Sequence, residues 1–234
     1  MTTQTFNNLV QEVRRAADIE TDGNHITDQE IKDYLNDSLR QVWSIIVNSS
    51  GGSLLAKVSP TLVQFGDDSH YYQLPNDFLR LISVDVRYNN TWAPSIEADP
   101  QNYAQLLTVD SSGTPFSQHY LYYNKEQSRY ELVMFPYRDP NNILVRYIPE
   151  APQLDAGTDV LDLPGDWERW VVYDSAIKCK MKDDEDPSLL LAERSRVEYM
   201  IIEDVKAHTP TGVKTIRDVS HRDEWSRFRL PDVT

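Results

Sequence analysis

Three acidic residues near the N-terminus have a spacing that could bind calcium. They alternate along the chain before a turn glycine, as the first ligands of an EF-hand loop do: Asp18, Glu20, Asp22 and then Gly23. The bidentate carboxylate of such a loop would fall at residue 29, which is a glutamine, and Glu30 lies one position too far. The spacing therefore favours a plain turn between two helices over a calcium site.

The histidines and the cysteine do not form a recognisable metal-binding pattern. The five histidines are scattered along the chain: His25, His70, His119, His208 and His221. None has another histidine four residues away, the spacing that places two imidazoles on one metal ion. Cys179 is the only cysteine, so an internal disulfide is impossible and a cysteine-based metal site would lack ligands. We predict no metal and no cofactor, and Cys179 fits a small apolar helix residue.

The sequence carries no signature of nucleophilic or phosphate chemistry. Gly-x-Ser-x-Gly is absent, and Ser50-Gly-Gly-Ser53 lacks the lysine of a phosphate-binding loop. Asp162 with Asp166, or Asp67 with Asp68, could act as glycosidase carboxylates, but a charged surface explains these acids more simply. We therefore predict that the protein is not an enzyme, and a cell-wall hydrolase remains an alternative.

The chain is strongly acidic. Its 234 residues carry a net charge of −14, with a pI near 4.7. Such a molecule repels a phosphate backbone, so specific reading of DNA is not expected. No apolar run is long enough to span a bilayer, and the first eight residues are polar. These features predict a protein that does not act in a membrane and that is made and assembled in the cytoplasm.

Helical periodicity occurs near both ends of the chain. Apolar residues recur every three or four positions over residues 5–17, and a second helix is expected to start at the capping box Thr27-Asp-Gln-Glu30. Residues 159–208 predict another helical pair, broken at Asp183–Asp186, with Asp166 as the side-chain cap of its first helix. Its apolar face should include Trp167, Trp170, Val171, Ile177, Met181, Val197 and Ile201.

Between the helices the periodicity changes from 3.6 to two. Short apolar segments alternate with turns of Gly, Asn, Asp and Pro, which indicates a β-sandwich or barrel-like module rich in tyrosine. A short helix is expected after Asp99. The predicted fold is α+β: a helical bundle of N- and C-terminal helices with an inserted antiparallel β module. The expected divisions are residues 1–56, 57–153 and 154–208, followed by an extended tail over 209–234.

The tail combines aromatic residues with cations. Five basic residues face four acidic ones in a chain that is otherwise acidic, and no long element is predicted to bury the apolar side chains. Such a segment suits docking onto an acidic neighbour, although packing across its own helices remains an equal alternative. The candidate binding residues are Lys214, Arg217, Arg222, Trp225, Arg227, Phe228 and Arg229.

Three stretches, in this order, resemble the head-to-tail adaptor proteins of tailed bacteriophages, the connector or tail tubular protein group. Residues 26–42 resemble the first long helix of such adaptors, with Asn36 after an apolar pair. Residues 74–81 are similar to the junction that leads into their sheet. Residues 147–154, then 158–163 and the helix that starts at 164–168, look like the return from the β module into the last helices.

The resemblance implies a structural virion protein without catalytic residues. Such adaptors form a ring, commonly of twelve copies, in the neck between the portal and the tail or nozzle proteins. Genomic DNA passes through the lumen without being read, and the tail over 209–234 would reach the portal or a neighbouring copy. Two alternatives remain: a sugar- or receptor-binding β module of a virion protein, suggested by the tyrosines, and a virion-associated cell-wall hydrolase.

Overall fold

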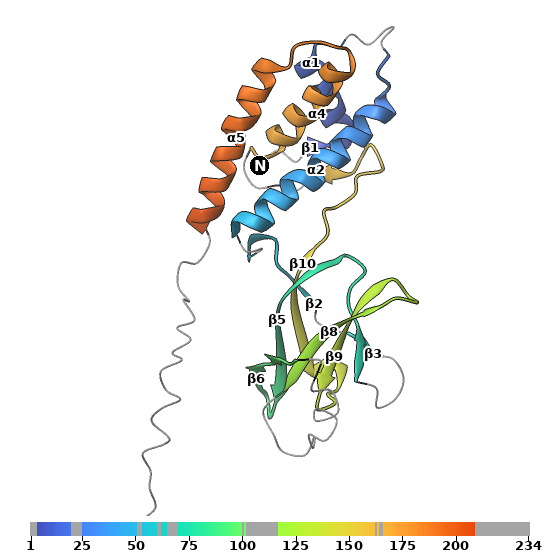
Figure 1. Ribbon diagram of the computed structural model, residues 1–234, viewed down its shortest axis with the longest axis vertical. Coiled ribbons are helices and arrows are strands. Elements are labelled where there is room, and N and C mark those ends of the chain that lie inside the picture. The colour runs from blue at the N-terminus through green and yellow to red at the C-terminus, as the bar shows by residue number, and fades with distance from the viewer. Residues whose placement is uncertain are drawn as a thin grey trace, which may run out of the picture.

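The computed structural model confirms the α+β class (Figure 1). It describes residues 4–19, 25–50, 53–59, 62–64, 70–99, 101, 117–161, 163 and 166–208. The predicted short helix after Asp99 falls mostly outside these residues, as does the tail. The long helices gather at one end of the long axis, and the two larger sheets lie at the other. The helical elements are α1 (Phe6–Ala17), α2 (Asp28–Ser50), η1 (Ser53–Leu55), η3 (Pro140–Asn142), α4 (Glu168–Lys182) and α5 (Ser188–His208).

The four long helices share one hydrophobic core. α4 packs against α1, α2 and α5, while α2 also contacts α1 and α5. The core includes side chains from both ends of the sequence, such as Leu9, Leu39 and Trp170, each no more than 2% exposed. Helices separated in sequence by the strands therefore form a single body.

Most of the predicted face of the C-terminal helices lies in this core. Trp167, Trp170, Val171, Ile177 and Ile201 are buried, and Val197 packs partly buried against them. Met181 does not belong to this face, because its side chain is 64% exposed at the end of α4. The inward positions of α4 include two polar residues instead, Asp174 and Ser175.

The helix termini match one sequence signal and differ from another. The capping box forms as predicted: Thr27 N–H donates to Glu30 Oε2 at 3.0 Å, and Glu30 N–H donates to Thr27 Oγ1 at 3.3 Å. Ser188 N–H donates to Asp186 Oδ1 at 2.9 Å where α5 begins. The predicted cap by Asp166 is wrong, because Trp167 occupies the N-cap of α4 without a side-chain bond. Asp166 instead forms an ion pair in which its Oδ2 lies 3.7 Å from Arg169 Nη2.

The strands form three sheets, paired antiparallel except for β7 with β8. The sheet orders are β1-β11, β2-β10-β5-β6 and β3-β4-β9-β8-β7. The strand bounds are β1 (Gln4–Thr5), β2 (Lys57–Ser59), β3 (Val63–Gln64), β4 (Tyr71–Gln73), β5 (Phe78–Tyr88), β6 (Thr91–Pro94), β7 (Ile96–Glu97), β8 (Gln118–Asn124), β9 (Arg129–Phe135), β10 (Ile143–Pro149) and β11 (Val160–Leu161).

The two larger sheets share a buried cluster. Val84 and Val145 from one sheet and Tyr72, Leu132 and Met134 from the other contribute to it. The described strands leave both sheets open, so they do not close into a barrel. One face of each sheet is thus covered by the other.

A two-residue turn at Asn89-Asn90 joins β5 to β6. Both residues have positive φ, 47° and 63°, which is the conformation that a two-residue type I′ hairpin requires and that asparagine tolerates. β3 also pairs antiparallel with β4, and residues 65–69 between them lie outside the described residues.

Residues 74–81 and 163–170 share Leu, Pro, Asp, an aromatic residue and Arg in register, but they lead into different structures. Phe78 begins the strand β5, whereas Glu168 begins the helix α4. From Phe78 onward the chain forms β5, which pairs with β10, whereas residues 168–182 form the helix α4. The shared residues therefore mark two boundaries without encoding the same element.

Candidate interaction surfaces

α2 holds the segment that returns from the last long strand. Asn36 Nδ2 donates to the Leu154 carbonyl at 2.9 Å, and Leu154 N–H donates to Asn36 Oδ1 at 2.9 Å. Two turns further along α2, Trp43 Nε1 donates to the Pro149 carbonyl at 2.9 Å. These bonds join α2 to the end of β10 and to the segment after it, and the two bonds from Asn36 satisfy backbone groups of Leu154 that lie outside any sheet.

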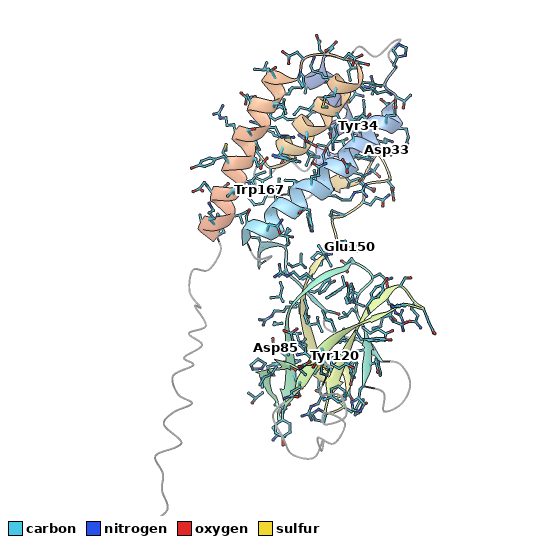
Figure 2. All side chains as sticks on the ribbon, in the orientation of Figure 1. Asp33, Tyr34, Asp85, Tyr120, Glu150 and Trp167 are labelled. Carbon is cyan, nitrogen blue, oxygen red and sulfur yellow. The ribbon has the colours of Figure 1, made fainter. Side chains whose placement is uncertain are left out.

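A groove of about 720 Å³ lies beside this junction, between α2 and the start of β5. Trp43 and Val47 line it as buried apolar side chains, and Leu79 adds a side chain that is 46% exposed. Its exposed charged lining consists of two guanidinium groups and one carboxylate: Arg40, Arg80 and Glu150. Figure 2 shows Glu150 where the strands meet the helices. The groove is therefore locally cationic in an acidic protein.

Asp77 fixes the strand ends next to this groove. It accepts hydrogen bonds from Lys57 Nζ and from the Tyr147 hydroxyl, both at 2.9 Å. Burial raises the pKa of Asp77, but the bonds from Lys57 and Tyr147 outweigh it and hold the pKa below its usual value. Burial and the adjacent carboxylate raise the pKa of Tyr147 to about 12. The ends of β2, β5 and β10 are thus held together by one ionised carboxylate.

A second polar cluster lies inside the helical body around Asp174, whose side chain is 3% exposed. It accepts from Ser38 Oγ at 2.8 Å, Lys178 Nζ at 2.9 Å and Arg194 Nη1 at 2.7 Å. Burial raises the pKa of Asp174, but the bonds from Lys178, Ser38 and Arg194 outweigh that and lower it overall. Because the donors come from α2, α4 and α5, the cluster fixes the mutual register of three helices.

The outward face of α5 is unusually apolar. Leu189 is 77% exposed, Tyr199 67% and Met200 51%, whereas Ile201 and Val205 point into the core. All the large hydrophobic side chains exposed on the four long helices lie on α5 or at the end of α4: Met181, Leu189, Leu191, Tyr199 and Met200. The outward positions of α1 and α2 are polar instead, as at Gln11 and Asp33. Exposed apolar groups of this kind mark interaction sites.

The exposed tyrosines of the β module do not form one platform. Tyr122 and Tyr123 follow one another on β8 and point to opposite faces. Tyr122 packs against Tyr71 with ring centroids 6.0 Å apart, whereas Tyr123 packs against Tyr130 at 5.1 Å. A sugar-binding surface of aligned rings is therefore not favoured by this arrangement.

The structure leaves several predicted sites undescribed. The tail residues chosen as binding candidates all lie in 209–234, outside the described residues. Glu20, Asp22 and Gly23 of the calcium-like turn are also outside the described residues. Asp18 closes α1 in a left-handed conformation (φ 59°). Within the described ranges no three His, Cys, Asp or Glu side chains gather where they could hold a metal ion. The carboxylates at 67, 68 and 162 are also outside these ranges.

Sequence reasoning missed the Asp174 cluster and the groove. The available signal for the cluster was an aspartate inside the apolar run of α4, with Lys178 one turn later. The groove had no local signal, because its walls come from segments far apart in the sequence. None of the described helices is long and apolar enough to cross a membrane.

A comparison with protein families identifies the chain. Residues 4–209, which include all the described helices and strands, match the SU10 adaptor protein family. No curated protein matches the chain in sequence. The match supports a phage adaptor-type protein, as the order of the three resembling stretches predicted. The chain belongs to the SU10 adaptor protein family.

Proposed function

We propose that this structural phage protein forms a closed ring in the virion neck, between the portal and the tail, with a lumen through which DNA passes. The observation that carries the proposal is the family match over residues 4–209. The family is one of phage adaptors, which act by contacting other structural proteins and not by catalysis. The ring, its twelve copies and its portal contact extend that family role to this chain, in the manner of the connector and tail tubular proteins.

The charge of the chain supports the lumen. A subunit with a net charge of −14 repels phosphates, so DNA can move past it without being held. The structure also offers a ring several separate surfaces, which a head-to-tail contact between identical copies requires. The outward face of α5 and the groove beside α2 are two such surfaces.

We further propose that the chain is divided into a body, an inserted module and a C-terminal arm. Residues 1–56 and 154–208 would form the body, residues 57–153 an inserted sandwich, and residues 209–234 an arm. The arm's candidate contacts to the portal or to a neighbour remain Lys214, Arg217, Arg222, Trp225, Arg227, Phe228 and Arg229.

The proposal is tested by measuring the mass of the purified chain with and without the portal protein of the same phage. A discrete complex containing portal and several copies of the chain is expected, and portal mixed with an unrelated acidic protein serves as the control. A chain that associates neither with portal nor with itself at high concentration would overturn the proposal.

A further inference from the structure

We propose that the outward face of α5 docks into the groove beside α2 of the next copy. This inference rests on the proposed ring and names the two surfaces that would build it. The docking residues on α5 are Tyr199, Met200 and Glu203, and those of the groove are Arg40, Trp43 and Arg80.

The α5 face has the properties of a ridge. Tyr199 and Met200 protrude from the middle of the helix and are more than half exposed, and Glu203 follows Tyr199 after one turn on the same face. The side chain of Glu203 is 50% exposed, and its Oε1 accepts from Lys206 Nζ at 3.0 Å, an exposed pair that a neighbouring guanidinium group can join or replace. The ridge is therefore apolar at Tyr199 and Met200, with the exposed Arg196 one turn before Met200 and the Glu203–Lys206 pair toward its C-terminal end.

The groove has the complementary properties. Its apolar lining is formed by Trp43, Val47 and Leu79, and the exposed guanidinium groups of Arg40 and Arg80 outnumber the carboxylate of Glu150. Guanidinium groups form strong paired bonds with carboxylates and stack on aromatic rings. A carboxylate and a tyrosine on a neighbouring helix are thus the chemistry that this groove suits.

The groove and the ridge have similar lengths. The α2 wall of the groove extends from Asn36 to Asn48, which at the helical rise is about 18 Å. The exposed stretch of α5 from Leu189 to Glu203 is about 21 Å long by the same measure.

The two surfaces also lie at compatible heights. The C-terminal halves of α2 and α5 both lie toward the end of the helical body that meets the strands (Figure 1). In a ring whose axis follows the long axis of the molecule, neighbours stand at the same height. The α5 ridge of one copy can then face the groove of the next, and because ridge and groove are different surfaces, the contact can repeat around a ring.

Engineered cysteines test the contact directly, because the native Cys179 is buried. Tyr199→Cys places a thiol on the ridge and Ser44→Cys places one in the groove. The double variant is assembled with portal, oxidised, and separated by size under denaturing conditions. It should give a ladder of covalent oligomers. The matched control replaces Ser44→Cys by Gln11→Cys on the exposed face of α1 and should give no ladder.

The outcomes separate this inference from the proposed function. Assembly with portal but no ladder would overturn the contact and leave the adaptor function intact. Covalent dimers from Tyr199→Cys alone would also overturn it, since they indicate an α5–α5 contact. Failure of the unmodified chain to assemble would overturn both.

A charge exchange tests the contact without cysteines. Glu203→Arg and Arg80→Glu should each lower the fraction of assembled chain about tenfold, and combining them should restore most of it. Losses that simply add in the double variant would contradict the pairing of these two surfaces.

Discussion

Asn36 and Leu154 are 118 residues apart in sequence, and they exchange two hydrogen bonds. The side-chain amide of Asn36 bonds both backbone groups of Leu154, much as a neighbouring strand would. This pairing fixes the place where the chain leaves the β module and re-enters the helical body. Trp43 makes a similar bond to Pro149 two turns along the same helix.

Replacing Asn36 with aspartate should destabilise the protein. Asn36→Asp keeps the size and the acceptor but sets a carboxylate against the Leu154 carbonyl, so the free energy of unfolding should fall by about 2 kcal/mol. Urea unfolding measures this loss. Asn48→Asp is the matched control, because Asn48 is exposed on the same helix and its Nδ2 donates to Ser44 Oγ, within α2 itself, at 3.4 Å. Equal losses in both variants would contradict the role given to Asn36.

Trp43→Phe tests the second bond. The ring stays buried while the indole N–H is lost, which leaves the Pro149 carbonyl without that donor and should cost about 1 kcal/mol of unfolding free energy. Trp92→Phe supplies the comparison, because Trp92 is 46% exposed on β6. Thermal unfolding should show a lower midpoint for Trp43→Phe alone.

The Asp174 cluster predicts a stability that depends on pH. The pKa of Asp174 is lower in the folded protein than in the unfolded chain, so its contribution is present above the unfolded pKa and is lost as pH falls through the folded pKa. Asp174→Asn leaves Lys178 and Arg194 without their buried carboxylate and should cost about 3 kcal/mol at neutral pH.

The difference between wild type and Asp174→Asn should narrow as the pH falls below about 4. Urea unfolding at a series of pH values measures it. Asp33→Asn changes an exposed aspartate of α2, and its unfolding free energy should follow that of wild type across the pH series. If the unfolding free energies of wild type and Asp174→Asn differed by the same amount down to pH 2, an ionised Asp174 would not be the source of the stability.

Cys179 should be unreactive until the protein unfolds. Burial raises its pKa to about 11, and the side chain is inaccessible in the helical core. At pH 8 we expect a thiol reagent to label the native chain about 100-fold more slowly than the unfolded chain. Ser44→Cys, exposed in the groove, should react at once, and rapid labelling of wild type would show that the core opens readily.

Much of the fold follows from local patterns. The capping box at Thr27 and Glu30 and the turn at Asn89-Asn90 depend on a few adjacent residues, so their geometry could be predicted. The α+β class follows from the change in periodicity between the terminal and central segments.

Features that depend on tertiary contacts could not be predicted. Met181 has the spacing of a core residue, but it lies in the last turn of α4, where its side chain remains exposed. Asp174 would be assigned to the surface from its type, yet Ser38 and Arg194, both distant in sequence, make it a buried ionised group. The ridge and the groove likewise become visible only when the helices are assembled.

Electron cryomicroscopy of the neck of intact particles tests the central claim most directly. We expect a closed ring of this chain beneath the portal, with α5 of each copy seated beside α2 of the next. Particles whose neck lacks this chain, or holds it as isolated copies that do not touch one another, would contradict it.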